Sequence, residues 1–145
     1  MTVTIRPAAH ADVEQLTDLE QQTYGSEGYP AALFYQALAQ WPSSFFVATQ
    51  QQRVCGYVLA APGDDQTLWI MSLLIAPSAR GHGIGQQLMR YLLDQRCIDT
   101  KLALTVAPDN HNAIRLYQRL GFRQAEYIPD FMGPQHDRLL LIYPE

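Results

Sequence analysis

The stretch Leu68-Trp69-Ile70-Met71-Ser72-Leu73-Leu74-Ile75, followed by Arg80-Gly81-His82-Gly83-Ile84-Gly85, decides the fold. The first run is almost entirely apolar and is closed by Pro77, which is typical of a strand buried on both faces. After the glycines, apolar residues recur at the spacing of one helix face: Ile84, Leu88, Tyr91 and Leu92. The sequence therefore predicts a strand, a tight glycine turn and an amphipathic helix in succession.

The glycine turn predicts a phosphate-binding site. Its three glycines let the backbone turn tightly and leave several N–H groups free at the N-terminus of the new helix. Free amides and the positive end of the helix dipole together attract phosphate. Each amide hydrogen bond to a charged oxygen is worth roughly 1.5–3 kcal/mol. We therefore expect a phosphorylated ligand here; a turn that merely joins strand to helix is the alternative.

Two familiar phosphate loops do not match this turn. A dinucleotide-binding loop has the form G-x-G-x-x-G, whereas the third glycine here comes one residue early. That loop is also followed, about 20 residues later, by an acidic residue for the ribose, and Thr105 and Val106 occupy that region here. A nucleotide-triphosphate loop needs Gly-Lys-Ser/Thr, and no lysine lies near the turn.

A second motif follows the turn. It runs Asn110-His111-Asn112-Ala113-Ile114-Arg115-Leu116-Tyr117 and continues to Gly121-Phe122, in the form N-x-x-A-I-x-x-Y-x-x-x-G-F. Together with R-G-x-G-I-G in this order and spacing, it resembles the GNAT superfamily of N-acetyltransferases, nearest in pattern to the ribosomal-protein alanine N-acetyltransferases. The resemblance spans nearly the whole chain, including the opening Val3-Thr4-Ile5-Arg6-Pro7-Ala8.

Length and patterning favour one layered α/β or α+β domain. A chain of 145 residues can bury a single core, and its strands are mixed with helices. The resemblance implies the GNAT fold, a single mixed, mostly antiparallel sheet flanked by helices, with a central parallel strand pair splayed around the cofactor. We therefore expect a single N-acetyltransferase domain over residues 1–145. The expected strands are 2–6, 45–49, 54–60, 68–75, 102–107, 122–127 and 138–143, with helices at 12–24, at 30–40, after the glycine turn and from Asn110 to Tyr117.

Composition excludes several classes of function. The chain has no run of 18 apolar residues and no basic start followed by an apolar run, so we expect neither a membrane span nor export. Cys55 and Cys97 show no metal spacing and suit free thiols in a cytoplasmic protein without metal. A net charge of −4 indicates no nucleic-acid partner and favours a cationic acceptor. A monomer and a homodimer both remain open.

The resemblance implies acetyl-CoA as the cofactor. In this superfamily the pantetheine arm pairs with the strand before the turn, the pyrophosphate lies on N–H groups of the turn, and Asn110 contacts the arm. Asn110 also stands where a helix N-cap belongs. A solvated side chain is the alternative for Arg80, and for His82 we favour it. The residues expected to bind the cofactor are Leu73, Leu74, Ile75, Arg80, Gly81, His82, Gly83, Ile84, Gly85, Gln86, Asn110, Ala113 and Tyr117.

Tyr117 is the expected catalytic residue. An amine that attacks a thioester expels a thiolate, and a phenol hydroxyl beside the sulfur can donate the proton that this thiolate needs. The resemblance gives this role to Tyr117, and the same pattern gives the oxyanion a backbone N–H near Leu73. The alternative is a core tyrosine, because Ala113, Tyr117 and Leu120 share one helix face.

The general base and the acceptor site are not assigned by a motif. The related branch carries a glutamate where this chain has Thr105, which cannot act as a base. Phe131 and Met132 stand where peptide-acetylating relatives tend to have tyrosines, so a small-molecule amine is at least as good a candidate as a peptide N-terminus. A non-catalytic acyl-CoA-binding module and a different phosphate ligand are the remaining alternatives. The candidate acceptor residues are Glu27, Tyr29, Asp130 and Phe131, with Glu126 as a further carboxylate.

Overall fold

The computed structural model describes residues 2–144 and divides the chain into two compact units. The N-terminal unit comprises Met1–Ala61 and Met71–Arg96, and the C-terminal unit comprises Pro62–Ile70 and Cys97–Glu145. Strand β4 (Thr67–Ile75) contributes its first residues to the C-terminal unit and its last five to the N-terminal unit. That the two units form a single acetyltransferase domain stays a prediction, and residues 1 and 145 lie outside the described part.

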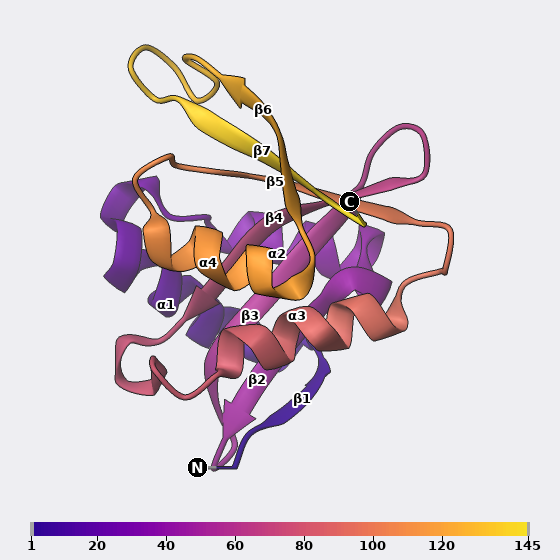
Figure 1. Ribbon diagram of the computed structural model, residues 1–145. Helices are drawn as coiled ribbons and strands as arrows, with labels where there is room; N and C mark the ends of the chain where they lie inside the picture. The colour runs from indigo at the N-terminus through magenta and orange to yellow at the C-terminus, as the bar shows by residue number, and fades with distance from the viewer. Residues whose placement is uncertain (1, 145) are drawn as a thin grey trace. The chain divides into compact units, whose positions relative to one another are not determined.

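The N-terminal unit is an antiparallel sheet covered by helices on both faces. Strands β1 (Thr4–Pro7), β2 (Phe45–Gln50) and β3 (Arg53–Pro62) pair in sequence order. Helices α1 and α2 lie on one side of these strands, and α3 lies on the other (Figure 1). The three helices span Val13–Tyr24, Ala31–Gln40 and Ile84–Gln95.

The alternation of side chains along β2 explains this sandwich. Phe45 and Val47 belong to the buried cluster that α1 and α2 cover with Leu16 and Phe34. The intervening Phe46 points to the other face, where its ring lies 4.8 Å from that of Tyr91 on α3. Both faces of the strand are therefore apolar, and all but the last residue of β2 are buried.

The C-terminal unit continues the sheet with β5 (Lys101–Val106), β6 (Arg123–Ile128) and β7 (Arg138–Tyr143). Parallel pairs join β4 to β5 from Thr67–Lys101 to Trp69–Ala103. Strand β7 lies antiparallel between β5 and β6, and helix α4 (His111–Leu120) connects β5 to β6. Hydrogen-bonded neighbours give the strand order β1-β2-β3-β4-β5-β7-β6. The expected fold class, a single mixed and mostly antiparallel sheet with flanking helices, is confirmed.

One expectation for β4 is wrong. The apolar run predicts burial on both faces, but only Ile70 and Leu74 are buried in this strand, and Trp69 is 37% exposed. An apolar run by itself does not distinguish a fully buried strand from a half-buried one. The Trp69 indole lies over Gly63, where an added Cβ would come within 2.6 Å of the ring.

Asp12 ties β1 to the start of α1 through an ion pair. Its carboxylate accepts two hydrogen bonds of 2.8 Å from the Arg6 guanidinium and one of 2.8 Å from the Ala9 N–H. Burial alone raises the pKa of Asp12, but the hydrogen bonds from Arg6 and Ala9 outweigh it and hold the pKa below its ordinary 3.8. The charged carboxylate therefore stabilises the folded state.

We expect Asp12→Asn to lower the free energy of unfolding by about 1–2 kcal/mol at neutral pH. Charge-assisted hydrogen bonds are worth about 1.5–3 kcal/mol, and solvent weakens this one because the Arg6 side chain is 40% exposed. A lowered folded-state pKa stabilises above the unfolded value and is lost as pH falls through the folded value. Urea unfolding should therefore show the gap between wild type and variant closing as pH drops below 3.8. A gap that is constant with pH would contradict this account.

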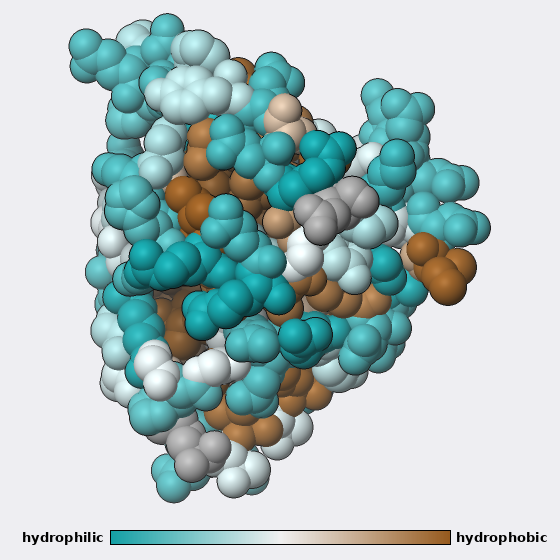
Figure 2. Space-filling model, viewed as in Figure 1, coloured by the Kyte–Doolittle hydropathy of each residue, from teal (hydrophilic) through white to brown (hydrophobic). Residues whose placement is uncertain are grey.

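Hydrophilic side chains cover most of the face seen in Figure 2, and hydrophobic ones show between them in separate patches. Within residues 2–144, no helix is long and apolar enough to cross a membrane. The compartment of the protein stays a prediction.

Candidate active site

The glycine turn has the backbone that the motif predicts. Gly81 and Gly83 have φ angles of +83° and +76°, in the left-handed region that favours glycine. Gly83 is the N-cap of α3, and as a glycine it has no side chain to cap the helix. The first backbone hydrogen bond of the helix runs from the Gln87 N–H to the Gly83 carbonyl. The N–H groups of Ile84, Gly85 and Gln86 therefore have no partner within the helix.

This geometry fits the pyrophosphate of acetyl-CoA. An added Cβ on Gly81 or Gly83 would meet nothing within 4 Å, so the backbone of the turn is open on its outer side. Unpaired N–H groups at the start of a helix of 12 residues are the donors that a phosphate needs. The residues present therefore suit the cofactor that the sequence implies.

We expect the side chains of the turn to contribute less to phosphate binding than its backbone does. The Arg80 Nε donates a 3.1 Å hydrogen bond to the carbonyl of Ile75, the last residue of β4, and the Arg80 side chain is otherwise exposed. His82 is exposed, as expected. Leu73 and Ile75 are half-buried and Leu74 is buried, so the three strand residues assigned to the pantetheine arm lie at the end of β4 next to the turn.

The second motif forms α4 in the C-terminal unit. Asn110 is the N-cap, and its side-chain oxygen accepts a 3.3 Å hydrogen bond from the Ala113 N–H. Tyr117 is 8% exposed on the face of α4 that Leu120 shares, and its ring lies 5.7 Å from that of Phe122. The left-handed Gly121, with φ +105°, ends the helix. The capping expectation is confirmed, whereas the cofactor contact of Asn110 and the catalytic role of Tyr117 stay predictions.

Arg138 stands beside Thr105, and no sequence signal predicted this neighbour. The Arg138 guanidinium donates to the Thr105 side-chain oxygen at 3.2 Å and to its carbonyl at 2.9 Å. Antiparallel pairing of β5 and β7 brings together these two residues, which lie 33 positions apart. Among the described residues, the one ion pair found is Arg6–Asp12, so this half-buried cation has neutral partners. The side chain of Thr105 thus lies beside a positive charge.

The candidate acceptor residues lie in two different units. Glu27 is exposed, and Tyr29 lies near β4, where its hydroxyl donates to the Met71 carbonyl at 3.4 Å. In the C-terminal unit, Asp130 shapes its own loop, because its carboxylate accepts a 2.7 Å hydrogen bond from the Gln135 N–H. Phe131 is 46% exposed, so its side chain is not part of the buried core.

The sequence patterns did not predict a buried polar cluster in the N-terminal unit. Glu20 on α1 is 1% exposed and accepts a 2.6 Å hydrogen bond from the Tyr57 hydroxyl of β3. The Tyr57 hydroxyl also lies 2.8 Å from the Ser72 hydroxyl of β4. A signal was present, because Glu20 follows Val13 and Leu16 at the spacing of the inward face of the helix.

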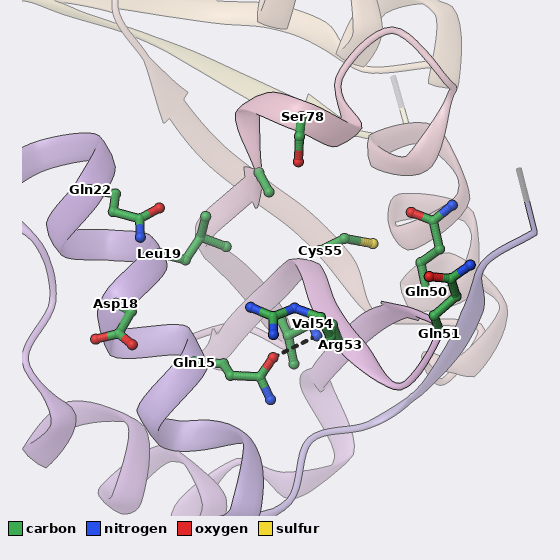
Figure 3. A pocket seen from close by; sticks show the side chains of 11 residues that line it. Gln15, Asp18, Leu19, Gln22, Gln50, Gln51, Arg53, Val54, Cys55 and Ser78 are labelled. Carbon is green, nitrogen blue, oxygen red and sulfur yellow. Dashed lines mark hydrogen bonds between the residues drawn. The ribbon is translucent and has the colours of Figure 1, made fainter.

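A cavity of about 350 Å³ lies elsewhere in the N-terminal unit. Its lining comes from α1, the β2–β3 hairpin and the segment after β4, and is largely polar (Figure 3). Gln15 crosses one wall and accepts a 2.9 Å hydrogen bond from the Val54 N–H. The lining includes none of the residues that the sequence assigned to the cofactor or the acceptor.

Comparison with known proteins decides the family. The model of the acetyltransferase (GNAT) family matches residues 13–122, a range that includes both motifs. The chain belongs to the GNAT acetyltransferase family. Family membership confirms the expected class of activity, an N-acetyltransferase that uses acetyl-CoA.

The relatives of this GNAT protein are named for different acceptors. N-alpha-acetyltransferase 30 of Schizosaccharomyces pombe is 31% identical over 126 residues, covering 83% of each chain. L-2,4-diaminobutyric acid acetyltransferase of Vibrio cholerae is 30% identical over 92 residues, which are 61% of this chain and 53% of the relative. The crystal structure of Ard1 from Thermoplasma volcanium superposes with a TM-score of 0.86 at 25% identity, covering 98% of this chain and 97% of that one.

Proposed function

We propose that this GNAT enzyme transfers the acetyl group of acetyl-CoA to the primary amine of a small molecule that also carries a carboxylate, such as an amino acid. The observation that carries the choice of acceptor is Arg138, a half-buried cation whose described partners are the oxygens of Thr105. An arginine fork pairs with a carboxylate through two parallel hydrogen bonds, better than any other side chain. The relative from Vibrio cholerae, named for a diamino acid, supports this class.

Each part of the site has one task in this proposal. Acetyl-CoA supplies the activated acetyl thioester. The N–H groups of the glycine turn bind its pyrophosphate, and the strand residues Leu73, Leu74 and Ile75 pair with its amide chain. The amine attacks directly, with no acetylated enzyme. Tyr117 donates a proton to the departing thiolate, and the backbone N–H near Leu73 stabilises negative charge on the carbonyl oxygen.

A peptide N-terminus is the second candidate acceptor. Its support is the relative from Schizosaccharomyces pombe, which is named as an N-alpha-acetyltransferase. Against it stands the exposed Phe131, which provides no hydroxyl to grip a peptide backbone.

Release of the coenzyme A thiol across a panel of acceptors tests the proposal. The panel holds amino acids, polyamines, aminoglycosides and short peptides with Ala or Ser at the N-terminus. Each reaction needs an acceptor-free blank, because the free thiol of Cys97 is exposed to thiol reagents, whereas burial raises the pKa of the Cys55 thiol. We expect release of the coenzyme A thiol to be fastest with amino acids. Release with peptides alone would replace the proposal by the second candidate, and cofactor binding without release to any acceptor would favour a non-catalytic acyl-CoA-binding module.

Arg138→Gln should raise KM for amino-acid acceptors by about 10–100-fold, because a charge-assisted hydrogen bond is worth about 1.5–3 kcal/mol. Arg138→Lys keeps the charge but loses the planar fork, so its KM should lie between those of wild type and Arg138→Gln. A polyamine provides the matched control, because it has no carboxylate for Arg138 to bind. Steady-state kinetics that show the same change in KM for both kinds of acceptor would exclude a carboxylate-binding role.

A further inference from the structure

The carboxylate of Glu20 is buried, and no cation among residues 2–144 forms an ion pair with it. Its Oε1 accepts a 2.9 Å hydrogen bond from the Tyr29 N–H, and its Oε2 accepts one of 2.6 Å from the Tyr57 hydroxyl. Within the described residues, the ion pair found is Arg6–Asp12, so two hydrogen bonds alone offset the burial of the Glu20 charge.

The hydrogen-bond chain from Glu20 has one direction. An ionised carboxylate can only accept, so the single proton of the Tyr57 hydroxyl goes to Glu20. The contact of 2.8 Å between Tyr57 and Ser72 then requires Ser72 to donate to the Tyr57 oxygen. Both hydroxyl protons therefore point from β4 toward α1. The lone pairs of the Ser72 oxygen remain available to accept a further proton.

The outer end of this chain lies where the acceptor is expected. Ser72 is half-buried on β4, next to Leu73 of the strand assigned to the cofactor arm. The Tyr29 hydroxyl donates to the carbonyl of Met71, the residue before Ser72. Gly28 holds the same loop against α1, because an added Cβ there would lie 2.8 Å from the Glu20 carbonyl oxygen. The loop with the acceptor candidates Glu27 and Tyr29 is thus fixed beside the strand.

We propose that Ser72, Tyr57 and Glu20 form a proton relay that removes the proton from the acceptor ammonium. The inference rests on the proposed acetyl transfer and supplies the base that Thr105 cannot provide. One N–H bond of the ammonium breaks and its proton passes to Ser72 Oγ. The Ser72 proton moves to Tyr57 Oη, and the Tyr57 proton moves to Glu20 Oε2. One proton is transferred in all, which leaves a neutral amine with its lone pair and a neutral carboxylic acid.

The hydrogen-bond geometry of the relay suits this transfer. Burial first, and then the hydrogen bond to Glu20, raise the pKa of Tyr57 far above its ordinary range, so this hydroxyl passes protons without ionising. The other titratable group that acts on Tyr57 is Tyr29, from the loop before α2. Each distance in the chain, 2.6 Å and 2.8 Å, is that of a good hydrogen bond.

The test is the pH dependence of kcat/KM in Glu20→Gln, Tyr57→Phe and Ser72→Ala. We expect each variant to lose about 100-fold in kcat/KM near neutral pH and to recover as pH approaches the pKa of the acceptor amine, because the amine then arrives neutral. An acceptor whose amine is already neutral at the assay pH should show no loss. Tyr91→Phe is the matched control, since Tyr91 packs on Phe46 at the opposite face of the sheet and should keep the profile of wild type.

Two readouts do not depend on turnover. Infrared difference spectroscopy should show the carbonyl band of a protonated carboxyl group when an ammonium acceptor binds, and Glu20→Gln should lack it. Affinity for acetyl-CoA, measured by calorimetry, should stay unchanged in all three variants. Ser72→Ala removes a half-buried hydroxyl, so it tests the relay even where Tyr57→Phe fails to fold.

The outcomes separate the relay from the function on which it rests. An active wild type whose three variants lose activity equally at every pH would overturn the relay and leave acetyl transfer in place. A wild type that acetylates no amine would overturn both. Losses near neutral pH that vanish at high pH, together with the Glu20 infrared band, would establish the relay.

Discussion

Tyr117→Phe should lower kcat by about 100-fold while leaving the affinity for acetyl-CoA nearly unchanged. General acid catalysis contributes about 10²–10⁴-fold, and the departing thiolate needs its proton only in the transition state. The variant keeps the aromatic ring that packs 5.7 Å from the ring of Phe122, so the helix and its core contacts should persist. Steady-state kinetics and calorimetry with acetyl-CoA measure the two effects separately.

Tyr143→Phe is the matched control for this substitution. Tyr143 belongs to the same group of rings, with its centroid 5.4 Å from that of Phe122, and has no role in the proposed chemistry. Its loss of a hydroxyl should leave kcat as in wild type. Equal kcat for Tyr117→Phe and wild type would remove the proton donor from the mechanism and make Tyr117 a core residue.

Gly83→Asp should weaken acetyl-CoA binding on the order of 100-fold more than Gly83→Asn does. Both side chains tolerate the left-handed φ of +76° better than other residues, and each finds open space at this N-cap. Only the charge differs between them. Two unit charges about 6 Å apart repel by about 2.8 kcal/mol at an effective dielectric constant of about 20, which is about 100-fold in affinity.

Calorimetric titration with acetyl-CoA at several salt concentrations measures this difference. Added salt should narrow the gap between the two variants, because it screens exposed charges. Equal affinities for Gly83→Asp and Gly83→Asn would show that no phosphate lies on this turn. The Asn variant itself controls for backbone strain and for competition by a capping side chain.

Local signals were sufficient for most of the fold. The alternation along β2, the stripe of α3 and the cap at Asn110 are each determined by neighbours within a few residues, so the sequence predicts them directly. Element ends differ by up to two residues, as for β1, which begins at Thr4 where residue 2 was expected. The exposure of Trp69 depends on what packs over the strand, which an apolar run does not reveal.

The candidate site also has parts that follow from local sequence and parts that depend on the folded sheet. Gly81 and Gly83 adopt the left-handed backbone that glycine favours, so the geometry of the turn follows from its own residues. Arg138 meets Thr105 only because β5 and β7 pair, and no local pattern encodes that contact. The position of Glu20 on the inward face of its helix can be predicted from the spacing of its neighbours. Tyr57 and Ser72 come from two strands, and their hydrogen bonds require the folded sheet.

Transfer of an isotopically labelled acetyl group tests the central claim most directly. Acetyl-CoA with a labelled acetyl group is mixed with the protein and an equimolar set of an amino acid, a polyamine and a peptide with a free N-terminus, and the products are analysed by mass spectrometry. The account predicts that label appears first on the amine of the amino acid and that Tyr117→Phe slows this step about 100-fold. Label on the peptide alone, or on none of the three amines, would contradict it.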